Sequence, residues 1–212
     1  MVAIPKLLAT RALEGAVVTI DAIGCQREIA RAIRAAKAHY LLPLKDNQPT
    51  MHAEVLMFME DLVASGAKGL TFSRHVDKGH GRVEVRRVWH SSDVAWFADR
   101  AEWKDLAGFV MVETVRTVNG VDGKPERRCF ITSLKADAKA FRKLVRRHWG
   151  IENRLHWELG AVFFEDHCLA RTGHGPEHCS TLSNKVLSLQ LPHAFERCGR
   201  APSAQEPIVS CN

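Results

Sequence analysis

The stretch that decides the fold of this chain reads Leu144-Val-Arg-Arg-His-Trp-Gly-Ile-Glu-Asn-Arg-Leu-His-Trp-Glu-Leu159. It is basic and rich in aromatic residues, and its apolar positions recur at the i, i+3, i+4, i+7 spacing of a helix with one buried face. That face comprises Phe141, Leu144, Val145, His148, Ile151, Leu155 and Leu159. The spacing predicts a long helix from about Ala138 to Glu158, with Glu152 at the border of its apolar face.

Strands and helices alternate in the first third of the chain. The β-branched run 16–20 predicts a buried strand that ends at Asp21, and residues 40–44 predict the next strand. Apolar residues at helical spacing predict one helix that opens at Gly24 and another over residues 50–64. This order favours an α/β layer in which the two strands run parallel.

The pattern changes after Gly66. Residues from about 70 to 133 alternate between apolar and polar, with turn signals at Lys78-Gly-His-Gly81 and Asn119-Gly-Val-Asp-Gly123. We therefore expect three parts: a discontinuous core of residues 1–66 and 134–192, a β-rich insertion of residues 67–133, and a disordered tail of residues 193–212.

Composition narrows the class of protein. The 212 residues carry a formal charge of +6 and a sequence pI of about 9.1, which favours polyanionic partners. Neither a signal peptide nor an apolar run of ~20 residues is visible, so no membrane partner is expected. The six cysteines form no Cys-x-x-Cys pair, which indicates a reducing, cytoplasmic setting.

Two acids stand out as candidate metal ligands. Asp21 closes a strand, and ligands of open α/β sheets collect at the carboxyl ends of strands, although such an aspartate can equally cap the next helix. Glu152 would be costly at a buried border unless it bound a metal or paired with an arginine, and both readings stay open. One acid on a strand end and one on a distant helix is the arrangement of metal-dependent nucleic-acid enzymes.

Weaker signals point to other ligands. The residues His148, Glu152 and His156 form a ladder that can be drawn as a zinc site, as can Cys168, His174, His178 and Cys179, but neither has the usual zinc spacing. The turn 78–82 is either an anion-binding nest of backbone N–H groups or a plain hairpin turn.

Four segments in order resemble the H-repeat-associated, ISAs-type family of insertion-sequence transposases. They are Val17-Val-Thr-Ile-Asp-Ala-Ile-Gly-Cys-Gln26, Leu44-Lys-Asp-Asn-Gln-Pro49, Lys78-Gly-His-Gly-Arg82 and His148-Trp-Gly-Ile-Glu-Asn-Arg-Leu-His-Trp157. The resemblance covers about residues 5–190. It implies membership of the broad DDE transposases, whose α/β fold is RNase H-like with a β insertion before the last acid.

By this resemblance Asp21 and Glu152 are the second and third acids of a catalytic triad that holds two Mg²⁺ or Mn²⁺ ions. The first acid of the family lies on an earlier strand, for which no candidate precedes Glu14. We therefore expect a partial core that lacks its first strands, the C-terminal part of a transposase. The absence of the first strand would leave an unpaired sheet edge prone to aggregation. The chain also departs from the family at Gly160, where an aspartate is usual.

The resemblance further implies that the partner is double-stranded DNA, both the insertion-sequence ends and the target. It also implies a possible homodimer and a cytoplasmic, nucleoid-associated location. Phosphate contacts are expected from residues Lys45, Asn47, Lys78, His80, Arg82, Arg147, His148 and Arg154. The alternatives are a catalytically inactive DNA-binding remnant, a metal-dependent nuclease of RNase H-like fold, and a chain that does not fold.

Overall fold

The computed structural model describes residues 3–9, 12–79, 81–151 and 208–211. The chain divides into two compact units. The first comprises Met1–Val145 and Glu206–Asn212, and the second comprises Arg146–Gln205. In the described part of the chain, no helix is both long enough and apolar enough to cross a membrane.

The described elements alternate in type, as expected for an α/β protein. The helices are α1 (Ala3–Ala9), α2 (Arg27–Ala35), α3 (Pro49–Ser65) and α4 (Ala138–Ile151), with 3-10 turns η1 (Ala22–Gly24) and η2 (Ala98–Glu102). The strands are β1 (Val17–Ile20), β2 (His39–Leu44), β3 (Thr71–Gly79), β4 (Arg82–Ser91), β5 (Gly108–Val118), β6 (Val121–Asp122), β7 (Glu126–Thr132) and β8 (Ile208–Cys211).

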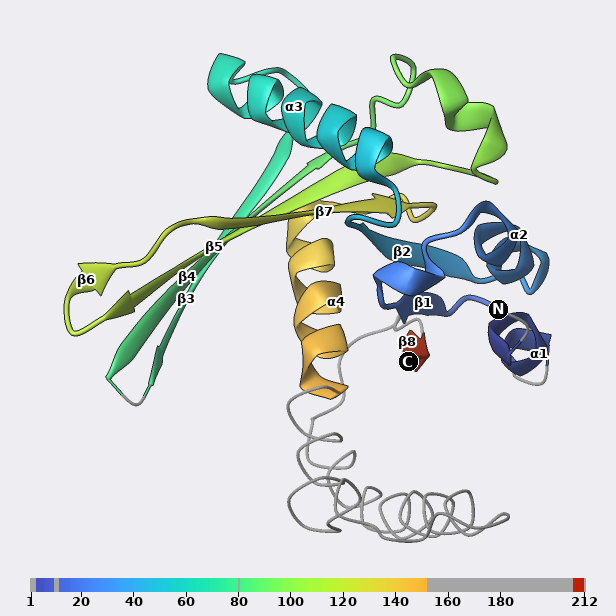
Figure 1. The fold of residues 1–212 in the computed structure, drawn as a ribbon, viewed down its shortest axis with the longest axis horizontal. Coiled ribbons are helices and arrows are strands. Elements are labelled where there is room, and N and C mark those ends of the chain that lie inside the picture. The colour runs from blue at the N-terminus through green and yellow to red at the C-terminus, as the bar shows by residue number, and fades with distance from the viewer. Residues whose placement is uncertain (1–2, 10–11, 80, 152–207, 212) are drawn as a thin grey trace, which may run out of the picture. The chain divides into compact units, whose positions relative to one another are not determined.

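One mixed sheet joins all the described strands (Figure 1). Its order is β3-β4-β5-β7-β2-β1-β8, with β6 paired to β5. Strand β1 runs parallel to β2, as predicted, and parallel to β8, whereas β2 pairs with β7 antiparallel. The α/β class is thereby confirmed.

Both faces of the sheet are covered at its centre. The register places Val18 and Ile20 on the same face as Tyr40 and alternate apolar residues of β5 and β7, and this face packs against α2 and α3 in the main core. The opposite face meets α4, where the Phe141 ring lies 4.8 Å from the ring of His90. Strands buried on both faces read as continuous apolar runs, which is why β1 was visible in the sequence.

Helix α4 confirms part of the predicted long helix. Phe141, Leu144 and Val145 are 0 to 8% exposed, so these members of the apolar face are buried as predicted. Arg147, between the apolar positions, is exposed. The expected continuation through residues 152–158, including Glu152, lies outside the described residues.

The β-rich segment continues the sheet of the core. Strands β3, β4, β5 and β7 form an antiparallel array, and β7 pairs directly with β2. Both expected hairpin turns are present, and Asn119 and Gly120 take the positive φ angles (52° and 81°) that the Asn-Gly signal predicts. The sheet therefore continues from β2 of the expected core into β7 of the expected insertion, and the core-and-insertion division stays a prediction.

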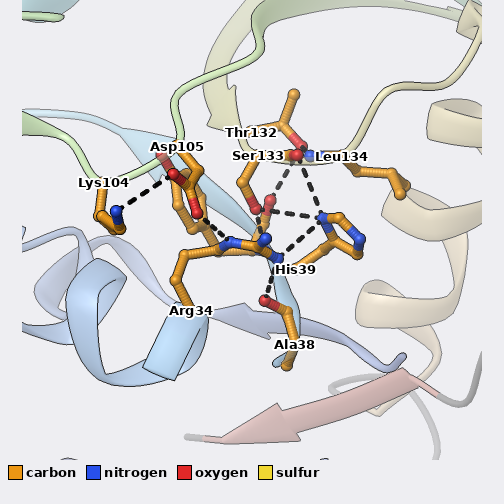
Figure 2. A network of polar contacts seen from close by, with 9 residues as sticks. Arg34, Ala38, His39, Lys104, Asp105, Thr132, Ser133 and Leu134 are labelled. Carbon is orange, nitrogen blue, oxygen red and sulfur yellow. Dashed lines mark hydrogen bonds and ion pairs between the residues drawn. The ribbon is translucent and has the colours of Figure 1, made fainter. Parts of the chain in front are cut away.

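A polar network ties the start of β2 to the end of β7 (Figure 2). Arg34 bonds Asp105 (Nε to Oδ2, 2.9 Å) and the Ala38 carbonyl oxygen (2.6 Å). His39 Nδ1 lies 3.1 Å from the carbonyl oxygen of Ser133, which can only accept, and 3.2 Å from Arg34 Nη1, which can only donate, so Nδ1 makes one of these two hydrogen bonds at a time. A groove of about 1200 Å³ opens beside this network, at the amino end of β2.

Two local expectations were wrong. Helix α2 begins at Arg27 rather than at Gly24, because a 3-10 turn first follows Asp21. The outer edge of β1, expected to be unpaired, is occupied by β8. For residues 208–211 the structure thus has a strand within the expected disordered tail, while residues 193–207 lie outside the described residues.

Candidate functional site

The candidate site is the edge of the sheet where β1 and β2 end. Because these strands are parallel neighbours, the residues that follow them lie side by side. Asp21 follows β1 and Lys45 follows β2, and the Lys45 Nζ lies 3.7 Å from Asp21 Oδ1. The structure therefore brings together the strand-end acid and one of the predicted phosphate contacts.

The Asp21 carboxylate is open to solvent. Its side chain is 53% exposed, and that of Lys45 is 54% exposed. Asp21 stands at the N-cap position of η1, yet its side chain makes no capping hydrogen bond. A half-exposed ion pair at 3.7 Å contributes little to stability. The carboxylate is therefore available to a cation, and helix capping is not its role.

Asn47 fixes the loop that carries Asp21. Its side-chain Nδ2 donates to the carbonyl oxygens of Ala22 and, at 3.4 Å, Cys25, while its Oδ1 accepts from the backbone N–H of Lys45 at 3.2 Å. One amide thus joins the loop after β1 to the loop after β2. Sequence reasoning placed Asn47 on DNA, and the structure gives it contacts within the protein.

A second clamp was missed by the sequence analysis. Gln48 Nε2 donates to the Cys25 carbonyl oxygen at 3.2 Å, beside the bond from Asn47. The run 45–49 was recognised as a turn, but the pairing of two loops 22 to 25 residues apart is a tertiary contact with no local signal.

Gly24 lets the chain turn tightly after Asp21. A Cβ at this position would meet the side chain of Ile20, with Ile20 Cβ only 2.9 Å away. The turn is closed by two backbone bonds, Gly24 N–H to the Asp21 oxygen (2.8 Å) and Cys25 N–H to the Ala22 oxygen (2.9 Å). Only glycine fits this close approach without moving the strand that presents Asp21.

The predicted basic turn is the β3–β4 hairpin. The register pairs Lys78 with Val83 and Gly79 with Arg82, so the Lys78 and Arg82 side chains leave opposite faces of the sheet. Both are exposed, and within the described residues neither forms an ion pair. His80 lies outside the described residues. The two free cations are sterically open to phosphate.

The neighbouring arginines are already paired. Arg87 donates to Glu113 at 2.7 Å, and Glu113 also accepts from Arg127 at 3.0 Å. Burial raises the pKa of Glu113, whose side chain is 8% exposed, but the hydrogen bonds from the two guanidinium groups outweigh it and lower the pKa below its ordinary value. These arginines hold the sheet together, which distinguishes them from Lys78 and Arg82.

The remaining predicted site residues belong to the second unit. At the end of α4, Arg147 is exposed and His148 is half-buried. Glu152 and Arg154 lie outside the described residues. So do His156, Cys168, His174, His178 and Cys179, on which the zinc alternatives depend. The predicted pairing of Asp21 with Glu152 therefore stays a prediction.

The described residues contain no complete metal site. Among them no group of three or more His, Cys, Asp or Glu side chains is placed to hold a metal ion. Asp21 supplies an exposed carboxylate, the hard oxygen ligand that Mg²⁺ prefers. Asp21 therefore fits the role of one ligand.

The mixed α/β sheet is compatible with the DDE transposase family that the four sequence motifs resemble. A family model for the transposase DDE domain matches residues 2–178. The chain belongs to this family.

Curated relatives agree with the family assignment. The chain is 36% identical over 194 residues to "Putative transposase YncI" of Escherichia coli O157:H7, covering 88% of the chain and 48% of the relative. It is 31% identical over 193 residues to "H repeat-associated putative transposase YhhI" of Escherichia coli strain K12, covering 88% of the chain and 50% of the relative. An uncharacterised protein of Xanthobacter autotrophicus, from the dhlA 3′ region, is 43% identical over 135 residues, covering 64% and 45%.

The chain therefore spans about half the length of the curated relatives it matches. No solved structure matches the chain.

Proposed function

We propose that this chain carries part of the catalytic core of a DNA transposase that cuts and joins insertion-sequence ends by metal-dependent phosphoryl transfer. The core would be RNase H-like, with residues 67–133 as a β-rich insertion. The observation that carries the proposal is the exposed, uncapped Asp21 carboxylate at the carboxyl edge of two parallel strands. Asp21 and Glu152 are the proposed metal-binding acids.

The chemistry requires positioning rather than acid–base side chains. Bound divalent ions, Mg²⁺ or Mn²⁺, stabilise the attacking and leaving oxygens of an in-line displacement at phosphorus. The chain's own contribution at this edge is to hold Asp21 in place through the Asn47 clamp and the tight turn at Gly24. Lys45, 3.7 Å from Asp21, then lies where a DNA phosphate would approach the acid.

The proposed partner is double-stranded DNA at the cell's nucleoid, bound by a dimer that holds two ends. The free cations Lys78 and Arg82 on the β3–β4 hairpin and the exposed Arg147 would contact phosphates. Such contacts release counterions, so DNA affinity should fall steeply with salt concentration. Each lysine or arginine replaced by alanine should reduce the slope of log K against log salt by about one unit.

The test is nicking of supercoiled plasmid by the purified chain with Mg²⁺ or Mn²⁺. Asp21→Ala and Glu152→Ala are compared with Asp61→Ala, which removes an exposed carboxylate from α3. Because the proposal gives this chain only part of the catalytic core, we expect the nicking to be weak, to need metal, to be lost in both site variants and to be retained by Asp61→Ala.

Other outcomes would assign another function. Salt-sensitive DNA binding without nicking, unaffected by Asp21→Ala, would identify a DNA-binding remnant. Nicking with no preference for insertion-sequence ends would identify a nuclease. Nicking that survives Asp21→Ala would refute the proposed site.

A further inference from the structure

Strand β1 depends on a neighbour that is distant in the sequence. A strand directs the N–H and C=O groups of alternate residues to its two sides, so β1 needs a partner on each side. One partner is β2, and the other is β8, formed by Ile208–Cys211. With β8 in place every residue of β1 is at most 2% exposed, and a backbone group buried there without a partner would cost about 1–3 kcal/mol.

The segment that fills this edge matches it residue by residue. In the register of the two strands Ile208 lies opposite Val17 and Val209 opposite Val18, so β-branched residue types occupy facing positions. Ser210 lies opposite Thr19, so residue types that carry a hydroxyl occupy the next pair of facing positions. In the sequence Pro207 directly precedes the strand, a position where proline is tolerated.

The same edge borders the candidate site. Cys211 lies opposite Ile20, and the next residue after Ile20 is Asp21. Because β8 is parallel to β1, its carboxyl end lies at the same edge of the sheet as Asp21 and Lys45. The strand that fills the edge is therefore in a position to hold β1, and with it Asp21, in register.

We propose that the outer edge of β1 is a docking site for a parallel strand of the chemistry Ile-Val-Ser-Cys. The segment 208–211 of the same chain fills this site, and a free peptide of the same sequence binds there when the segment is removed. Recognition combines backbone hydrogen bonds with alternate side chains, as in other additions of a strand to a sheet edge. This inference goes beyond the proposed function, and its test involves no DNA.

The experiment compares the full chain with a variant that lacks residues 206–212. Amide hydrogen exchange at Val17–Ile20 is measured with and without a peptide of residues 204–212, under reducing conditions. We expect the deletion to speed exchange in β1 by about tenfold or more, which corresponds to a loss of about 1.4 kcal/mol or more. Added peptide should restore protection.

The matched control is a peptide in which residues 209 and 210 are exchanged. It has the same composition, but the pleat sends valine to the face of Thr19 and serine to the face of the main core. This peptide should not restore protection. Equal protection by both peptides, or unchanged exchange in the deletion variant, would overturn the proposal.

A second variant covers the case in which the deletion variant does not fold. A full-length chain with Val209→Ser and Ser210→Val keeps its length and should speed amide hydrogen exchange at Val17–Ile20. Unchanged hydrogen exchange in this variant would overturn the proposal. Protection of β1 that rises with protein concentration in the unaltered chain would assign the docked strand to a second copy and overturn its assignment to the same chain.

Discussion

Replacing Asn47 with alanine distinguishes two possible roles of its side chain, a clamp between two loops and a contact to DNA. The structure gives the Asn47 amide bonds to Ala22, Cys25 and Lys45, of which the donor bonds are partly buried. A typical hydrogen bond contributes about 0.5–1.5 kcal/mol net, and Asn47 itself is exposed, so the loss should be about 1–2 kcal/mol. For a chain of this size that corresponds to roughly 3–6 °C in Tm.

The assay combines thermal unfolding with hydrogen exchange at the Gly24 and Cys25 amides, which close the turn after Asp21. Asn47→Asp is the informative partner variant, because it keeps the acceptor for Lys45 but points a carboxylate at two carbonyl oxygens. It should destabilise at least as much as Asn47→Ala, whereas Asp46→Ala, at an exposed neighbour, should change Tm little. Unchanged Tm and exchange in Asn47→Ala, together with weaker DNA binding, would refute the clamp and restore the predicted DNA contact.

Three further variants test the packing around the site and the sheet. Gly24→Ala should cost about 1–3 kcal/mol in chemical unfolding because its Cβ meets Ile20, whereas Gly79→Ala, with no atom within 4 Å and an ordinary φ, should cost far less. Glu113→Gln should lower stability by about 1–2 kcal/mol at pH 7. The pKa of this carboxyl is lowered in the fold, so its contribution to the free energy of unfolding is present above about pH 4.5 and is lost as pH falls through the folded pKa. The variant lacks this contribution. A stability difference between the two chains that stays constant from pH 7 to pH 3 would contradict this. Burial lowers the pKa of His90, although the charge of Asp137 opposes this, so the free energy of unfolding should fall as pH drops below about 6.5. His90→Leu should remove this pH dependence when unfolding is measured between pH 7 and pH 5.

The local pattern predicted most of the elements but little of their assembly. The apolar runs at 16–20 and 40–44, the Asn119-Gly120 turn and the buried face of α4 are repeating or short-range signals, and the structure has all of them. Two apolar runs separated by one helix sufficed to predict the parallel pair that places Asp21 beside Lys45.

The rest depends on contacts between residues far apart in the chain. The pairing of β7 with β2 joins residues about 90 positions apart, and that of β8 with β1 joins residues 191 positions apart, as at Val17 and Ile208. Four residues such as Ile208–Cys211 have no periodicity long enough to predict a strand. The Asn47 clamp could not be predicted for the same reason, because the local sequence around an asparagine in a turn is the same whether its side chain contacts DNA or another loop.

The central claim is that Asp21 marks a site for divalent metal. The most direct measurement is the paramagnetic broadening of backbone amide resonances by substoichiometric Mn²⁺, in the unaltered chain and in Asp21→Asn. The account predicts broadening centred on Asp21 and on the loop that begins at Lys45, lost in the variant and displaced by excess Mg²⁺. Broadening centred elsewhere, or unchanged in Asp21→Asn, would contradict it.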